Sequence, residues 1–367
     1  MTTTAPAPGA TPPPSADEAA RPARRRRGGG LGSYLLVRAL LIIPTVFILV
    51  TTVFFLMRTT GDPITAALGG RLPADQLQER IAAAGYDRPL LTQYVEYLGG
   101  ILRGDFGTTL SDRRPVTEVL TTFGAATLEL AFYSVLVALV VGIPLGMVAA
   151  RLRDRYPDAL LRVFAIFCYA TPVFFAGLLL KLVFSVWLDW LPVAGRISTR
   201  GQIELGRSGS DTGVYLIDSI SSGDGDLVSD VLQHAVLPSI ALGLLTAGVF
   251  LRLVRTNMIG TLGSGYVEAA RSRGVKESRL VRKHAYKPAL IPIITVIGLQ
   301  VALVLSGAVL TETTFEWRGL GFQLGQYLQA RDFVAVQGIV ALLAVIVALT
   351  NFVVDVVAAL IDPRVRF

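Results

Sequence analysis

Six long apolar runs decide what this chain can fold into. Each is at least as long as the roughly 20 residues that a helix needs to cross a bilayer. Of the 367 residues, 52% are hydrophobic and only 17% are charged, against roughly 25% charged in a soluble domain. The sequence therefore predicts an all-α polytopic membrane protein with six transmembrane helices. The runs are Tyr34–Met57, Ala125–Ala150, Leu160–Leu188, Val236–Ile259, Ala289–Leu310 and Phe333–Ile361.

Basic residues gather in alternate connections between these runs, and this predicts the orientation. Arginines follow the second and sixth runs, and nine Lys or Arg lie between Arg252 and Lys287. Such residues mark the cytoplasmic side. We therefore expect a multi-pass protein of the cell (inner) membrane with both termini in the cytoplasm. The same placement accounts for the net charge of +7 without a nucleic-acid partner.

The remaining segments divide by composition. Residues 1–30 are rich in Ala, Pro, Thr and Gly and predict a disordered basic cytoplasmic tail. Its run of four arginines, Arg24–Arg27, either holds the N-terminus inside or contacts anionic lipid. We expect outer segments at about 58–124, 189–235 and 311–332, and a cytoplasmic loop at about 260–288. The first outer segment predicts an amphipathic helix near Ala74–Ala84 and turns at Gly61–Pro63 and Gly99-Gly100.

The sequence lacks the motifs of common catalytic centres. None of its four lysines follows a glycine, so there is no phosphate-binding P-loop. Its two histidines, His234 and His284, have no partner at metal-ligand spacing, and no nucleophile elbow occurs. The single cysteine, Cys168, lies in an apolar run and predicts a packing role. We expect no catalytic residue, no metal site and no cofactor in this chain.

The cytoplasmic loop is long and basic, and its glycines and prolines divide it into short segments. Gly265 can open a helix with Glu268 in its first turn, where a carboxylate favours the helix dipole. Gly274 stands where a left-handed cap would end that helix. A second short helix from Lys276 to Tyr286 would stop at Pro288. This pattern predicts a helix–turn–helix that docks a soluble partner; the alternative is a solvated loop that only sets topology.

The loop also carries a family resemblance. The stretch Tyr266–Gly274, followed by His284-Ala285 and Leu290-Ile291-Pro292, resembles the EAA loop of ABC importer permeases. Other motifs, in order and spacing, resemble the dipeptide/oligopeptide/nickel permeases. They are Tyr34–Arg38 with Ile43-Pro44, Gly61-Asp62-Pro63, Asp87–Leu90, Gly104–Gly107, Ala126–Leu130, Gly142–Gly146, Trp190-Leu191-Pro192, Glu316–Gly321 and the ending Asp355 to Arg366.

The resemblance covers residues 31–367 and implies a type I ABC importer permease fold. It implies an ATPase-coupling loop formed by Glu268, Ala269, Ala270, Gly274, His284 and Pro292. It also implies partners: a second homologous permease in a heterodimeric pair, two ABC ATPase subunits or one fused ATPase that bind ATP and Mg, and an extracytoplasmic solute-binding protein. The cargo implied is a di- or oligopeptide, with nickel, glutathione or another small solute as alternatives.

Polar residues inside the apolar runs are candidates for lining the pathway. We single out Gln300 in the fifth run, with Glu129 and Lys181, which lie in the outer halves of the second and third runs and can pair. Asp355 lies near the cytoplasmic end, where water or a basic loop can satisfy it. A candidate outer gate or binding-protein contact consists of Glu316, Trp317, Arg318, Gly319 and Gly321.

Two other classes of membrane protein compete with this interpretation. A secondary transporter or channel would favour paired intramembrane carboxylates or inverted repeats, and the sequence has neither. A sensor or scaffold would carry a soluble output domain, for which no segment is long enough.

Overall fold

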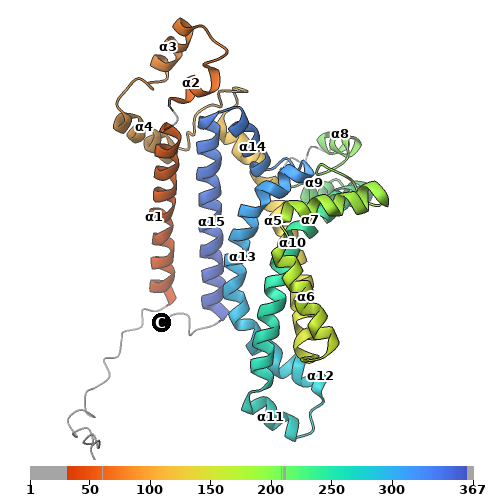
Figure 1. Ribbon diagram of the computed structural model, residues 1–367. Coiled ribbons are helices and arrows are strands. Elements are labelled where there is room, and N and C mark those ends of the chain that lie inside the picture. The colour runs from red at the N-terminus through yellow and green to blue at the C-terminus, as the bar shows by residue number, and fades with distance from the viewer. Residues whose placement is uncertain (1–30, 60, 208, 210–211, 362–367) are drawn as a thin grey trace, which may run out of the picture.

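The computed structural model of the protein describes residues 31–59, 61–207, 209 and 212–361, and the predicted tail at 1–30 lies outside them. Within these ranges the chain forms helices and no strand (Figure 1). We call the end of the bundle that carries α11 and α12 the lower end, and the end that carries α2–α4 and α14 the upper end. The helices are α1 Leu31–Arg58, α2 Pro63–Leu68, α3 Ala74–Ala83, α4 Leu90–Leu102, α5 Val116–Arg151, α6 Tyr156–Ala170, α7 Val173–Leu180, α8 Thr199–Arg207, α9 Tyr215–Ser221, α10 Gly225–Leu262, α11 Gly265–Ser272, α12 Glu277–Arg279, α13 Tyr286–Phe315, α14 Leu320–Gln329 and α15 Phe333–Ile361.

Two long helices, α5 and α10, form the centre of the bundle. Glycines let their backbones approach, because a Cβ on Gly142 would lie 2.8 Å from the carbonyl oxygen of Ala247. A Cβ on Gly243 would lie 2.6 Å from the carbonyl oxygen of Ser134. Small residues at helix contacts are typical of membrane bundles, in which close packing holds helices together.

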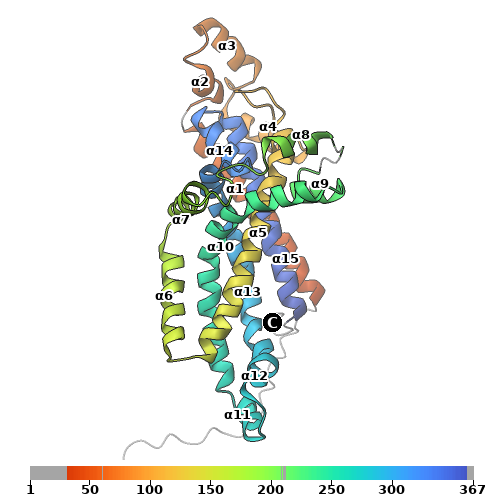
Figure 2. The ribbon, with the colours of Figure 1, turned by 90° about the vertical axis from the view of Figure 1, so that its right-hand side faces the viewer.

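The other long helices pack around this pair. Leu130 of α5, Leu242 of α10 and Val304 of α13 share one buried cluster. α15 packs beside α13, and α1 packs on the outer side of α15 (Figures 1 and 2). Arg38 of α1 and Asp355 of α15 form an ion pair at 3.3 Å, so the partner of Asp355 is a neighbouring helix rather than a basic loop.

By length and composition, four described helices can cross a membrane, or six spans result if each of two bent helix pairs counts as one. The four are α1, α5, α10 and α15. The predicted third span, Leu160–Leu188, corresponds to one of these bent pairs, because the chain turns by 106° between α6 and the following helix. Proline disfavours a helical residue before it, and Thr171, which precedes Pro172, is extended. α6 alone, with 15 residues, spans only about 22 Å.

The first outer segment matches its prediction in part. The amphipathic helix is α3, and Asp62 caps α2 by accepting a hydrogen bond from the Thr65 N–H at 2.7 Å. The predicted turn at Gly99-Gly100 is wrong, because both residues lie inside α4. Gly100 is needed instead for a close contact, since a Cβ there would lie 2.9 Å from the carbonyl oxygen of Asp105.

Candidate functional site

The lower end of the bundle carries a compact helical loop, residues 263–285, which we call the lower loop. Its first helix, α11, ends in a complete Schellman motif. The Val275 N–H donates to the Ala270 carbonyl at 3.3 Å, and the Gly274 N–H donates to the Arg271 carbonyl at 3.0 Å. Gly274 has φ +77°, as the predicted glycine turn requires. The motif reverses the chain within three residues.

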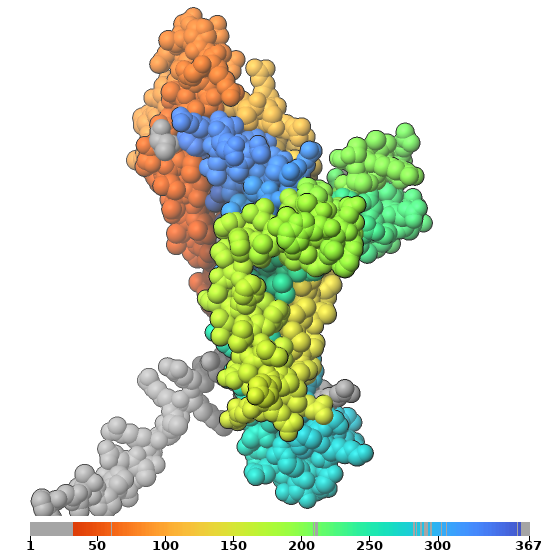
Figure 3. All heavy atoms as spheres, turned by 45° about the vertical axis from the view of Figure 1, so that its right-hand side comes forward, coloured from red at the N-terminus to blue at the C-terminus, as the bar shows by residue number. Residues whose placement is uncertain are grey.

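Buried apolar side chains anchor the lower loop to the bundle. Val267, Leu280 and Ala285 are fully buried, whereas Glu268 and Ala269 are exposed. An ion pair joins the two limbs: the Arg271 guanidinium donates to both carboxylate oxygens of Glu277, at 3.1 and 3.0 Å. This hydrogen bonding lowers the pKa of the Glu277 carboxyl. The loop thus presents one polar helical face on a fixed base, and it stands out as a knob in Figure 3.

The second limb differs from its prediction. Pro288 does not end a helix; it lies near the start of α13, which continues without a break from a π-helical turn. The limb itself consists of α12 and a π-helical turn at Leu280–Ala285. His284 lies in this turn and Pro292 lies in α13, and the structure describes only the backbone of these two candidate residues.

At the upper end, Glu129 forms a buried ion pair with a residue other than the predicted partner. Glu129 does not pair with Lys181. Its carboxylate accepts hydrogen bonds from Arg196 at 2.5 Å, from the Tyr133 hydroxyl at 2.9 Å and from the Leu216 N–H at 3.0 Å. Arg196 lies in the loop before α8, a segment whose polar, Gly/Ser-rich composition does not predict a buried charge.

Lys181 has a different environment. It donates to the Thr314 carbonyl at 2.8 Å and lies over the Phe315 ring, 5.5 Å from its centroid. The expected pair fails because the bend after α6 carries Lys181 to the end of α13. Gln300, the third candidate for lining the pathway, is half-buried within α13.

The segment between α13 and α14 folds around a carboxylate that the sequence analysis missed. Glu312 is fully buried and accepts hydrogen bonds from the Thr127 hydroxyl at 2.7 Å and the Phe322 N–H at 2.9 Å. A Cβ on Gly319 would lie 2.4 Å from this carboxylate, and one on Gly321 would lie 2.5 Å from the Val309 Cα. The available signal was an acid four residues before Glu316, just beyond the expected end of the fifth run.

Trp317 is an internal residue of this segment. Its side chain is fully buried, and its indole N–H donates to the Ala126 carbonyl at 2.9 Å. It therefore offers no surface to a partner in this conformation. Glu316 and Arg318, on either side of it, are exposed. Of the five candidate outer-gate residues, these two alone present side chains to the surroundings.

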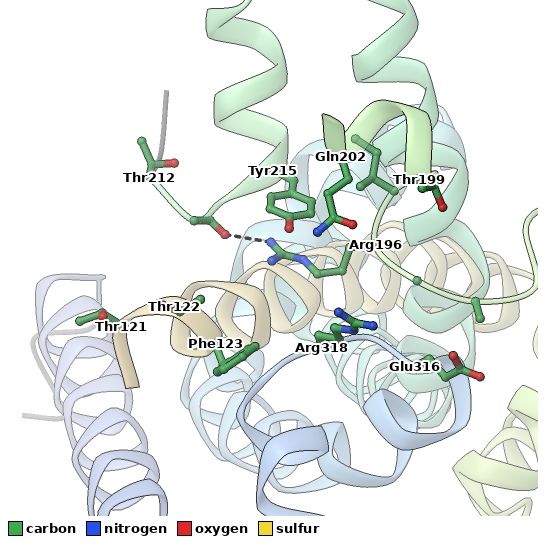
Figure 4. A pocket seen from close by; sticks show the side chains of 14 residues that line it. Thr121, Thr122, Phe123, Arg196, Thr199, Gln202, Thr212, Tyr215, Glu316 and Arg318 are labelled. Atoms are coloured by element: carbon green, nitrogen blue, oxygen red, sulfur yellow. Dashed lines mark hydrogen bonds between the residues drawn. The ribbon is translucent and has the colours of Figure 1, made fainter. Parts of the chain in front are cut away.

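A polar cavity of about 610 Å³ opens beside this segment (Figure 4). Its wall brings together the start of α5, the loop before α8, the start of α9 and the turn after α13. The charged side chains that line it are Arg196, Glu316 and Arg318, and its polar residues include Thr199 and Gln202. Within the described residues, no group of three His, Cys, Asp or Glu is placed to hold a metal ion.

Comparisons with known proteins find relatives that align with most of the chain. The sequence profile of the family described as "Binding-protein-dependent transport system inner membrane component" matches residues 142–367. The di/tripeptide transport system permease protein DppB of Pseudomonas aeruginosa (strain UCBPP-PA14) is 38% identical over 91% of this chain and 98% of its own. The dipeptide transport system permease protein DppB of Escherichia coli (strain K12) is 37% identical over the same shares. The glutathione transport system permease protein GsiC of Salmonella paratyphi A is 34% identical over 91% of this chain and 99% of its own.

Proposed function

Because the chain belongs to the inner membrane components of binding-protein-dependent transport systems, we propose that it is the permease subunit of an ABC importer for di- and oligopeptides. An extracytoplasmic solute-binding protein delivers the peptide to the upper end. Separate ATPase subunits, two chains or one fused chain, bind ATP and magnesium and dock on the lower loop. A second homologous permease completes a heterodimeric pair in the membrane.

The lower loop is the observation that carries this proposal. It joins an exposed polar helix face, with Glu268 and Ala269, to a base of fully buried residues. Such a loop can transmit the movement of a bound partner to α10 and α13, because α13 continues directly from its second limb and only Gly263 and Ser264 separate α10 from its first. A loop that only set topology would need positive charge but no buried anchor.

Other observations support the proposed orientation and cargo. The lower end carries Arg271, Arg273, Lys276 and Arg279, and basic residues of short loops remain in the cytoplasm, so both termini lie there. Peptide cargo is supported by the names of the two DppB relatives. Glutathione, a modified tripeptide, is the second candidate, favoured by the match to the Salmonella permease.

Charge reversal on α11 tests the coupling role of the lower loop. Glu268→Lys places a cation on the exposed docking face, and an unfavourable charge at an interface costs several kcal/mol. We expect ATPase binding to weaken at least about tenfold and peptide uptake to fall with it. Both are measured on the complex assembled in lipid vesicles, by co-purified ATPase and by uptake of a labelled dipeptide.

The matched control is Glu79→Lys, the same reversal on an exposed residue of α3 at the upper end. It should keep ATPase binding at the parental level. If Glu268→Lys retains both ATPase and uptake, the lower loop is not the coupling element.

A further inference from the structure

The upper-end cavity contains an arginine that is buried, fixed and only partly used. Arg196 is 7% exposed, and its Nη2 donates to Glu129 and, at 2.9 Å, to the Gly213 carbonyl. Its guanidinium stacks on Tyr215, 3.7 Å from the ring centroid. Among the described residues, its Nε has no hydrogen-bond partner. A buried donor left without a partner costs about 1–3 kcal/mol, so an acceptor that reached this nitrogen from the cavity that Arg196 lines would be stabilised.

A second arginine lines the same cavity. Arg318 is exposed and belongs to the turn between α13 and α14, which Glu312 and Trp317 hold in place. Figure 4 shows Arg196 and Arg318 at the same part of the cavity wall, with Glu316 set apart from both. Glu129 occupies only the Nη2 end of Arg196. The two guanidinium groups thus leave donors that no carboxylate of the cavity wall satisfies.

We propose that this cavity binds the C-terminal carboxylate of a peptide, with Arg196 and Arg318 as its two donors. Guanidinium groups match carboxylates in shape and bind them through paired hydrogen bonds. The stacked Arg196 is already oriented, which reduces the entropy lost on binding. The volume of about 610 Å³ lies within the range of sites for small ligands. The cavity would hold a peptide at the upper mouth before it enters the bundle. This inference rests on the proposed function.

A cysteine-protection experiment tests occupancy directly. Thr199 is exposed and lines the cavity, and the single native Cys168 is buried. In Thr199→Cys on the full chain in lipid nanodiscs, we expect a free dipeptide to slow maleimide labelling. The same dipeptide as its C-terminal amide should require at least about tenfold higher concentration, because it has lost a charged acceptor.

Two variants separate the cavity from general charge effects. Arg318→Gln in the Thr199→Cys background should raise the protecting concentration about tenfold. Arg200→Gln removes the same charge next to the probe, from a side chain that is 87% exposed on α8 and does not line the cavity, and should leave protection unchanged. Because Arg318 is exposed, its replacement leaves the buried Glu129–Arg196 ion pair intact. A loss of protection in Arg318→Gln therefore reports the loss of the Arg318 guanidinium and not damage to that pair.

Equal protection by the amide, or none by the free dipeptide, overturns the proposal. Protection that appears only with an added solute-binding protein also overturns it and assigns the cavity to a protein contact. Uptake by the assembled transporter is measured separately. Protection without dipeptide uptake refutes the proposed function alone, and dipeptide uptake without protection refutes this inference alone.

Discussion

At the residue scale, buried carboxylates organise the upper end. Glu312 gains donors from α5 and from the start of α14. Asp332 likewise accepts hydrogen bonds from the Leu110 and Ser111 N–H groups, at 2.6 and 2.8 Å. Buried polar groups of this kind are stable only when their hydrogen bonds are satisfied. The glycines of the neighbouring turn leave the space that the Glu312 carboxylate occupies.

Gly319→Ala should therefore destabilise the upper end. The new methyl group would lie 2.4 Å from the Glu312 carboxylate, and overpacking of this kind costs about 1–3 kcal/mol. The backbone itself is extended at Gly319, with φ −108°, so alanine adds no conformational strain. We expect a lower apparent Tm of the detergent-purified chain. Gly325→Ala is the control, because a Cβ on that α14 residue meets nothing within 4 Å in the described part of the chain, and it should leave Tm unchanged or raise it. Equal Tm values for both variants would contradict the assigned role of Glu312.

At the element scale, the lower loop depends on one backbone conformation. Gly274 has φ +77°, and a Cβ there would meet no described atom within 4 Å, so the cost of substitution is conformational. Gly274→Val should cost at least about 1–2 kcal/mol and open the Schellman motif. The measurement is amide hydrogen exchange, which should rise at Gly274 and Val275. Gly265→Val, at the start of α11 with equal space around it, should leave exchange near parental. Unchanged protection in Gly274→Val would show that the motif does not hold the loop.

Sequence patterns predict correctly those features that depend on a residue and its close neighbours in the chain. The start of α11 at Gly265 and the turn at Gly274 are as expected, because helix-opening and left-handed positions are properties of single residues. Pro172 predicts a kink or a helix end after α6, but the sequence does not predict a bend of 106°, since hydrophobicity is the same on both sides of this proline. Long-range contacts were also missed. Glu129 pairs with Arg196, 67 residues away, rather than with Lys181, and no local sequence pattern predicts which of these two cations it contacts.

At the scale of the whole molecule, the protein is a multi-pass membrane protein, and its two ends should face opposite sides of the bilayer. Ser272 is exposed on the lower loop, and Gln329 is exposed at the end of α14 at the upper end. We expect Gln329→Cys to react with a membrane-impermeant thiol reagent in intact cells, and Ser272→Cys to react only after lysis. The parental chain is the control, because its only cysteine, Cys168, is buried. Reaction of both variants from outside would contradict the proposed orientation.

The hydrogen bonds of the upper end also set the order in which the chain can complete its fold. Asp332 closes a contact with Leu110 across 222 residues, and Glu312 closes one with Thr127 across 185. Contacts between segments so far apart form late, because bringing the two segments together costs conformational entropy before the contacts contribute any stabilisation. During synthesis the first two-thirds of the chain can enter the membrane, but Thr127 and Ser111 must wait for the last third to emerge. The carboxyl-terminal helices therefore form their contacts last, and these contacts stabilise a fold whose first helices entered the membrane earlier.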